Sequence, residues 1–147
     1  MLVDRTLVNC KVYLEGEILE AGIAIENGKI VKIGKEPNLP KSSEKINLNG
    51  CLALPGLIDV HVHLRDQRQA YEETFYTGTA AAAAGGITTV LDMPNNEPVT
   101  MSVQTLRERM KTAEKQALTN IAFYSAFPEE KNQIIQIVKE RVNRHLS

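Results

Sequence analysis

Two histidines two positions apart are the residues of this sequence best suited to chemistry. His61 and His63 stand in the run 59–65, Asp-Val-His-Val-His-Leu-Arg, and side chains along a strand alternate between its faces, so both imidazoles fall on one side. Imidazole suits zinc, and also iron, nickel or manganese. Two strand histidines can instead simply pack or form hydrogen bonds, since a zinc site needs further ligands. Because they are two of only three histidines and close a predicted strand, we predict that His61 and His63 bind one divalent metal ion.

Two neighbouring side chains are suited to hold a charged substrate. Arg65 continues the same predicted face, and a guanidinium can hold a carboxylate through two parallel hydrogen bonds. A surface ion pair with Asp66 or Glu72 is the alternative for Arg65. Asn95 follows a Met-Pro pair, whose proline fixes a turn. Its amide can both donate and accept, although asparagine is also an ordinary turn residue.

The other chemically capable side chains are predicted to be structural or exposed to solvent. Asp59 lies a full strand repeat before the histidine pair, so we expect a structural carboxylate rather than a metal ligand. His145 falls in a polar helix end and is expected at the surface. Cys10 and Cys51 have no paired spacing that would indicate zinc or redox chemistry. We predict buried, reduced thiols, which fit a cytoplasmic protein.

Alternating strands and helices after Pro55-Gly56 must position these residues. Strands are predicted at 57–63, 87–91 and 121–126, and helices over 73–84, from Thr100 or Ser102, and from Pro128. This alternation indicates the parallel βαβ units of an α/β fold, and (β/α)₈ barrels carry active sites at the carboxyl ends of their strands. A closed barrel needs eight units and about 250 residues, so we expect the first part of a larger barrel, about three βα units.

Residues 1–54 show a different pattern, of short strands and turn signals. Asn27-Gly28 supplies the positive φ values of a tight hairpin, and Asn49-Gly50 marks a second turn. We predict a small antiparallel β unit. The predicted domains are therefore 1–54 and 55–147.

The composition excludes several classes of partner. The chain has 147 residues, of which 43% are hydrophobic and 24% charged, as is typical of a soluble globular domain. Seventeen basic against eighteen acidic residues give a net charge of −1, so no basic excess attracts nucleic acid or an anionic membrane. The longest uncharged stretch, 74–91, contains polar residues and paired glycines, which argues against a membrane span.

Two longer segments resemble the dihydroorotases, which are cyclic amidohydrolases of the amidohydrolase superfamily. They are 54–65, Leu-Pro-Gly-Leu-Ile-Asp-Val-His-Val-His-Leu-Arg, and 77–95, which ends in Leu-Asp-Met-Pro-Asn. Allantoinases and dihydropyrimidinases belong to the same wider group, but an Arg directly after His-Val-His-Leu and an Asn directly after Met-Pro are typical of dihydroorotases. The resemblance runs through essentially the whole chain. It has one departure: many relatives carry Pro-Gly shortly after an Arg-Asp or Arg-Glu pair, where this chain has 67–70, Gln-Arg-Gln-Ala.

The resemblance implies the N-terminal part of a metal-dependent (β/α)₈ TIM barrel, preceded by a small antiparallel β-sandwich segment. It implies that His61 and His63 bind zinc, with one or two ions in a complete enzyme, and that His63, Arg65 and Asn95 contact the substrate. The family's general base, bridging carboxylate and two further histidines would fall beyond residue 147, so no catalytic residue is assigned here. The implied reaction is the reversible zinc-dependent cyclisation of N-carbamoyl-L-aspartate to dihydroorotate in de novo pyrimidine biosynthesis, in the cytoplasm.

Other interpretations stay open. The chain could belong to an allantoinase- or dihydropyrimidinase-type cyclic amidohydrolase, or it could be a non-catalytic scaffold module that binds aspartate transcarbamoylase. Besides the small-molecule substrate, we consider one further partner, a second copy of this chain in a homodimer. We expect the chain to be an incomplete N-terminal fragment that is inactive alone.

Overall fold

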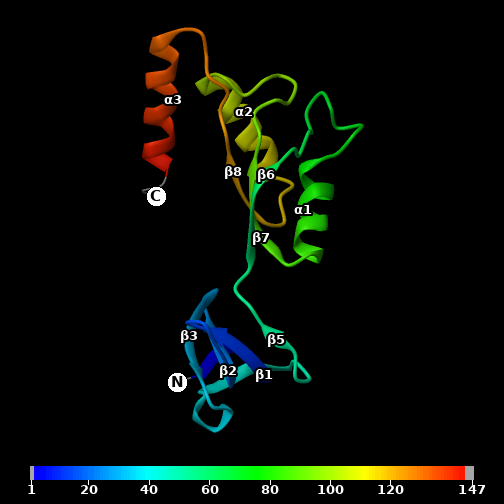
Figure 1. Cartoon of the computed structure of the whole chain (residues 1–147), viewed down its shortest axis with the longest axis vertical. Helices are drawn as coiled ribbons and strands as arrows, with labels where there is room; N and C mark the ends of the chain where they lie inside the picture. Colours follow the sequence, from blue (N-terminus) through cyan, green and yellow to red (C-terminus); the bar gives the residue numbers. More distant parts are fainter. Residues whose placement is uncertain (1, 145–147) are drawn as a thin grey trace. The chain divides into compact units, whose positions relative to one another are not determined.

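Two compact units make up the chain, residues 1–55 and 56–147, and the computed structural model describes residues 2–144. Each unit contains its own sheet (Figure 1). The prediction for His145 falls outside the described residues.

The first unit is built on a five-stranded sheet. Its elements are β1 (Leu2–Leu14), β2 (Glu17–Glu26), β3 (Lys29–Gly34), the 3₁₀ helix η1 (Glu36–Asn38), β4 (Lys41–Asn47) and β5 (Leu52–Ala53). The strand order is β3-β2-β1-β4, and β5 also pairs with β1. Glu15-Gly16 joins β1 to β2 and Asn27-Gly28 joins β2 to β3, all four residues with positive φ, so the predicted Asn27-Gly28 hairpin is confirmed.

The prediction of an antiparallel β unit is wrong in part. Strand β1 pairs antiparallel with β2 but parallel with both β4 and β5. After β3 the chain passes through η1 and returns along the opposite edge of the sheet, so β4 runs in the same direction as β1. Strand β4 is absent from the sequence predictions because Lys-Ser-Ser-Glu-Lys-Ile-Asn contains one large apolar residue, and an edge strand needs no more.

One added methyl group at Gly22 is expected to destabilise this unit. A Cβ there would lie 2.7 Å from both the Leu7 carbonyl oxygen and Leu39 Cδ1, and the backbone oxygen cannot move aside cheaply. Gly34, which pairs with Gly22 across β2 and β3, has no atom within 4 Å of such a Cβ. Gly22→Ala should therefore lower the free energy of unfolding by about 1–3 kcal/mol, and Gly34→Ala should change it by less than about 0.5 kcal/mol. Urea denaturation followed by circular dichroism measures both, and equal effects would contradict the expectation.

The second unit alternates strands and helices. In chain order they are β6 (Leu57–Val62), α1 (Phe75–Ala84), β7 (Ile87–Asp92), α2 (Val103–Glu114), β8 (Asn120–Phe123) and α3 (Lys131–Arg144). The strands form a parallel sheet in the order β6-β7-β8, and α1 and α2 lie beside it (Figure 1). The predicted parallel βαβ pattern is confirmed. The predicted boundaries are less accurate, since β8 ends at Phe123 instead of Ala126 and α3 begins at Lys131 instead of Pro128.

Hydroxyl side chains set the starts of the first two helices. Thr74 caps α1 through a reciprocal capping box with Thr77, and Ser102 caps α2 in the same way with Thr105. Of the two predicted caps of α2, the structure therefore uses Ser102. The end of α1 falls at Gly85, as the paired glycines predict.

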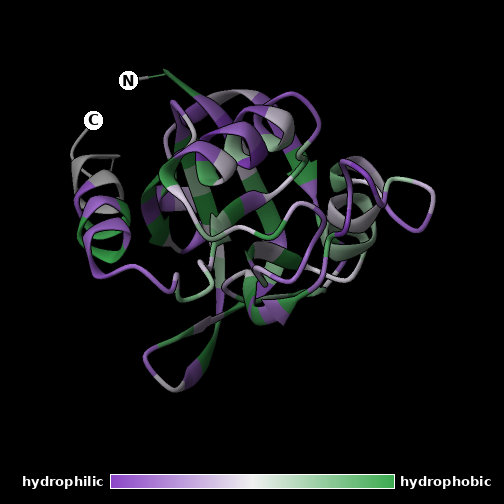
Figure 2. Cartoon of the chain, turned by 90° about the horizontal axis from the view of Figure 1, so that it is seen from above, coloured by the Kyte–Doolittle hydropathy of each residue, from purple (hydrophilic) through white to green (hydrophobic). Residues whose placement is uncertain are grey.

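The core of the second unit lies directly under the carboxyl ends of β6 and β7. Leu64, Phe75, Val90 and Ala113 are buried together there. Hydrophobic and hydrophilic residues are interleaved along the strands and the helices (Figure 2). Because Leu64 sits between His63 and Arg65 in the sequence, burial of its side chain anchors the segment that carries both of them.

Candidate functional site

The two histidine rings lie side by side at the end of β6. His61 belongs to the strand and His63 follows its last residue, and their ring centroids are 5.2 Å apart with the ring planes inclined by 63°. Both side chains are exposed. Within residues 2–144, Asp59 does not form a three-ligand group with them, and its Oδ1 accepts a hydrogen bond from the backbone N–H of His61 at 3.1 Å.

Asn95 contacts the histidine pair from the loop after β7. Its Oδ1 lies 2.7 Å from Nδ1 of His63. An amide oxygen can only accept a hydrogen bond, so the neutral His63 tautomer that fits this contact carries its proton on Nδ1 and has a lone pair on Nε2. A hydrogen bond to the far nitrogen is the usual way in which proteins orient a metal-binding imidazole. The arrangement thus leaves one imidazole nitrogen of an exposed side chain available at the end of β6.

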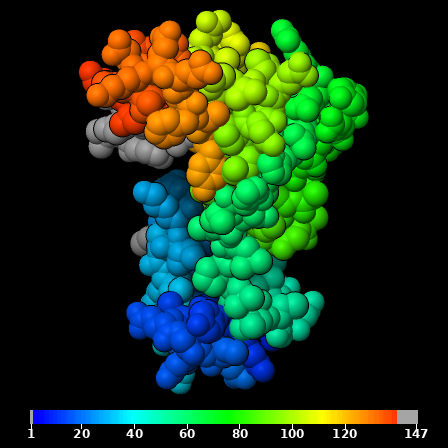
Figure 3. Space-filling model, turned by 45° about the horizontal axis from the view of Figure 1, so that its top comes forward, coloured from blue at the N-terminus to red at the C-terminus, as the bar shows by residue number. Residues whose placement is uncertain are grey.

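Arg65 is not on the strand, contrary to the prediction that it continues the same face. Arg65, Asp66 and Gln67 have φ values of 35°, 56° and 52°, so the chain leaves β6 through a left-handed turn that strand alternation does not describe. Nε of Arg65 lies 3.4 Å from Oε2 of Glu72, and both side chains are partly exposed. The surface ion pair considered as the alternative therefore exists. The segment between β6 and α1 (green) projects at the surface in the space-filling view (Figure 3).

A buried ion pair, absent from the sequence predictions, underlies these residues. Asp92 at the end of β7 and Arg109 of α2 each expose 1% of their side chain, and Nε of Arg109 donates to Oδ2 of Asp92 at 2.7 Å. Burial raises the pKa of Asp92 above its ordinary value, while the Arg109 charge and the N–H of Leu64 act in the opposite direction. Helical spacing could have predicted that Arg109 is buried. It stands three positions after Leu106 and four before Ala113, on the buried face of α2.

The described residues 2–144 contain no cluster of three or more His, Cys, Asp or Glu side chains able to surround a metal ion. His61 and His63 are therefore a pair of donors without a third protein ligand within this part of the chain.

Among residues 2–144, no helix has both the length and the apolar character needed to cross a membrane.

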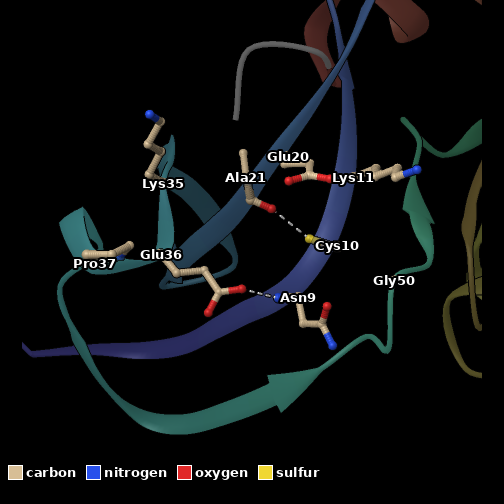
Figure 4. A pocket seen from close by; sticks show the side chains of 9 residues that line it. All are labelled: Asn9, Cys10, Lys11, Glu20, Ala21, Lys35, Glu36, Pro37 and Gly50. Atoms are coloured by element: carbon tan, nitrogen blue, oxygen red, sulfur yellow. Dashed lines mark hydrogen bonds between the residues drawn. The ribbon is translucent and has the colours of Figure 1, made fainter.

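A separate cavity of about 380 Å³ lies in the first unit beside Cys10 (Figure 4). Glu36 accepts a hydrogen bond from the N–H of Asn9, and Sγ of Cys10 donates to the Ala21 carbonyl at 3.0 Å. Burial, aided by the charge of Glu36, raises the pKa of the Cys10 thiol, so it stays protonated and weakly nucleophilic. Cys51 is exposed, and the prediction of two buried thiols holds only for Cys10.

Fold and site together define a parallel α/β unit whose polar side chains gather where β6 and β7 end. The chain belongs to the amidohydrolase family, which it matches over residues 52–143. Among its relatives, the dihydroorotase of Methanosarcina acetivorans is 42% identical over 117 residues, which are 80% of this chain and 25% of that protein. The dihydroorotase of Thermococcus kodakarensis is 46% identical over 120 residues, 82% of this chain and 29% of that protein.

Solved structures give the same fold. An L-hydantoinase (dihydropyrimidinase) from Arthrobacter aurescens superposes with a TM-score of 0.84 at 28% identity, over 94% of this chain and 31% of that one. A D-hydantoinase superposes with a TM-score of 0.78 at 26% identity, over 95% of this chain and 30% of that one. The chain thus spans between a quarter and a third of the length of these relatives.

Proposed function

We propose that this chain is the N-terminal share of a zinc-dependent dihydroorotase, which interconverts N-carbamoyl-L-aspartate and dihydroorotate. The observation that carries the proposal is the pairing of His61 and His63 at the end of β6, with Asn95 bonded to one of them and Arg65 on the adjoining loop. The similarity to dihydroorotases of about 40% identity supports the choice of reaction. We further propose that residues 1–54 correspond to the β-sandwich segment and 55–147 to the first three barrel units.

The separation of the two rings fits joint binding of one zinc ion. A zinc–nitrogen bond of about 2.1 Å and about 1.1 Å more to the ring centre put each centroid about 3.2 Å from the ion, so two ligands at a tetrahedral angle have centroids about 5.2 Å apart. The rings of His61 and His63 are separated by 5.2 Å. His63 would use Nε2, since Nδ1 is engaged with Asn95.

Within this site the chain's own residues would hold the metal ion and orient the substrate. Bound zinc would lower the pKa of a coordinated water and polarise the ring amide carbonyl. Asn95 accepts the Nδ1 proton of His63 in a hydrogen bond, which keeps Nε2 free to donate its lone pair. Arg65 would exchange its partner Glu72 for the substrate carboxylate, and so fix the ring by a charge-assisted hydrogen bond. We assign no general base within this chain.

A second candidate is a hydantoinase-type reaction, favoured by the TM-score of 0.84 with the Arthrobacter enzyme. The two candidates differ at Arg65, because dihydroorotate carries a ring carboxylate and an unsubstituted hydantoin does not. A guanidinium beside the metal can pair with the carboxylate of dihydroorotate, but hydantoin offers it no such group. We therefore place dihydroorotate first.

A chimera tests this choice by supplying the remaining length of the enzyme. The aligned 117 residues of this chain replace their counterparts in the Methanosarcina acetivorans dihydroorotase, and hydrolysis of dihydroorotate and of hydantoin is assayed with zinc present. We expect turnover of dihydroorotate, and Arg65→Met should lower kcat/KM about 30–150-fold, since a charged contact of this kind contributes about 2–3 kcal/mol. Arg65→Met should leave any hydantoin turnover unchanged.

The outcomes separate the open interpretations. Preferred hydrolysis of hydantoin, insensitive to Arg65→Met, would support the hydantoinase-type reaction. A chimera that is folded and zinc-loaded but turns over neither substrate would contradict an enzymatic role and favour a scaffold, to be followed by a binding assay with aspartate transcarbamoylase. Arg68→Met, which alters an exposed arginine of the same loop, is the matched control and should change neither activity.

A further inference from the structure

The Arg109 guanidinium contacts three parts of the rim of the second unit at once. Nε donates to Oδ2 of Asp92 at 2.7 Å, and Nη2 lies 2.6 Å from the same oxygen as an ion-pair contact. Nη1 donates to the backbone carbonyl of Arg65 at 2.8 Å and to Oε1 of Gln67 at 3.1 Å. The guanidinium carbon also lies 4.7 Å from the centre of the Phe75 ring, in cation–π contact.

These contacts fix the backbone on both sides of Leu64. The N–H of Leu64 donates to Oδ1 of Asp92 at 2.9 Å, so Asp92 holds the peptide group that follows His63. Arg109 holds the carbonyl of Arg65, where φ of 35° starts the left-handed turn. The Asp92–Arg109 pair thus holds the chain immediately after the second histidine and immediately after the proposed substrate-binding arginine.

Gln67 links Arg109 to the loop that contains Asn95. Its Oε1, already bonded to Arg109, also accepts from Nδ2 of Asn96 at 3.4 Å. Asn96 is 4% exposed, donates to the Pro98 carbonyl at 2.7 Å and accepts from Thr100 at 3.0 Å. The residues that stand where many relatives have Pro-Gly therefore join the loops after β6 and β7 by side-chain hydrogen bonds.

Burial of this ion pair is not explained by stability alone. A buried pair of charges gives up its hydration, and replacing both partners with apolar residues is often neutral or stabilising. Such a pair can instead fix the positions of the groups around it, because a planar guanidinium donates hydrogen bonds only to acceptors placed around its edge. We propose that Arg109 is a positioning residue, which sets the end of β6 and the loop after β7 so that His63, Arg65 and Asn95 face one site. The inference rests on the function proposed above for those three residues.

The test uses the metal-free 147-residue chain, labelled with ¹⁵N in its histidines. In the unchanged chain we expect the His63 ring to carry its proton on Nδ1, bonded to Asn95. Arg109→Lys keeps the buried charge but cannot reach Asp92, Arg65 and Gln67 together, so the end of β6 should shift and the ring should change to the Nε2–H tautomer. Zinc affinity, measured by competition with a chelating dye, should fall about 10–100-fold, as it does when supporting residues of a metal site are altered.

A second pair of variants keeps Arg109 and Asp92 intact in case Arg109→Lys does not fold. Gln67→Leu removes the shared acceptor and Gln67→Glu retains it. Loss of the acceptor should speed hydrogen exchange of the Arg68 and Glu97 amides, which bridge the two loops, by about 3–10-fold. Gln67→Glu should restore the slow exchange of both amides.

Arg68→Lys is the matched control and should leave every measurement unchanged. A folded Arg109→Lys chain with an unaltered His63 tautomer would overturn the positioning role. So would a Gln67→Leu chain in which both amides exchange at the original rate. Failure of the unchanged chain to bind zinc would contradict the proposed function instead, because the tautomer and exchange measurements need no metal.

Discussion

Replacing Arg109 by leucine is expected to lower the free energy of unfolding of the second unit by about 3–5 kcal/mol, because removal of one partner leaves a buried charge uncompensated. Asp92 exposes 1% of its side chain and would keep the hydrogen bond from the Leu64 N–H but lose the charged donor. A loss of this size is comparable with the total stability of a small domain, about 5–15 kcal/mol. Urea denaturation followed by circular dichroism measures it.

The same variant should show a characteristic dependence on pH. Burial already raises the pKa of Asp92, and removal of Arg109 takes away the strongest opposing influence, so the pKa in the folded variant should rise further. Between the ordinary carboxyl pKa and this raised value the folded state binds more protons than the unfolded state, so stability falls as pH rises. The deficit of Arg109→Leu relative to the unchanged chain should therefore be largest at neutral pH and shrink on acidification.

Two comparisons make this expectation specific to the ion pair. Arg68→Leu removes an exposed arginine from the nearby loop and should change stability by less than about 0.5 kcal/mol. Asp92→Asn combined with Arg109→Leu removes both charges, so the double variant should lose less than the sum of the two single losses. Additive losses that do not vary with pH would show that the pair is not coupled in this way.

The second large effect is expected at the histidine pair itself. We predict that the 147-residue chain binds zinc weakly and is catalytically inactive alone, since two imidazoles leave most of the coordination shell to water. His61→Ala with His63→Ala should reduce zinc affinity at least about 100-fold, because loss of direct ligands must cost no less than the 10–100-fold seen for supporting residues. The pair is exposed, so the substitutions should leave the fold unchanged.

Zinc binding by cysteine must be separated from binding by histidine. Cys51 is exposed and its thiolate is a strong zinc ligand, so all variants are compared in a Cys51→Ser background. Cys10 is buried and donates to a backbone carbonyl, and it is left unchanged. Metal-dependent turnover by the chain alone that disappears in the double histidine variant would contradict the prediction of inactivity.

Sequence patterns predicted the positions that follow from strand and turn periodicity. Alternation along 59–65 placed His61 and His63 on one side, and Asn27-Gly28 and Gly85-Gly86 ended their elements as expected. The same periodicity failed at Arg65, because three successive positive φ values interrupt it and nothing in Arg-Asp-Gln indicates them. Strand β4 was missed because its polar sequence lacks the apolar alternation that marks a half-buried strand.

The buried polar contacts were hardest to foresee. Arginine on a helix is normally exposed, so Arg109 does not draw notice even though its spacing places it on the buried face of α2. Its partners Asp92, Arg65 and Gln67 come from other segments of the chain, and only the folded backbone brings them together. Periodicity within one element carries no information about such contacts between elements.

The most direct measurement of the central claim is a zinc titration of the Cys51→Ser chain followed by NMR of its ¹⁵N-labelled histidine rings. The signals of the His61 and His63 rings should shift together and saturate at one ion per chain, with Nδ1 of His63 keeping its proton and donating it in a hydrogen bond to Oδ1 of Asn95. Equal zinc affinity in the double histidine variant, or a shift of only one of the two rings, would contradict a shared metal site at the end of β6.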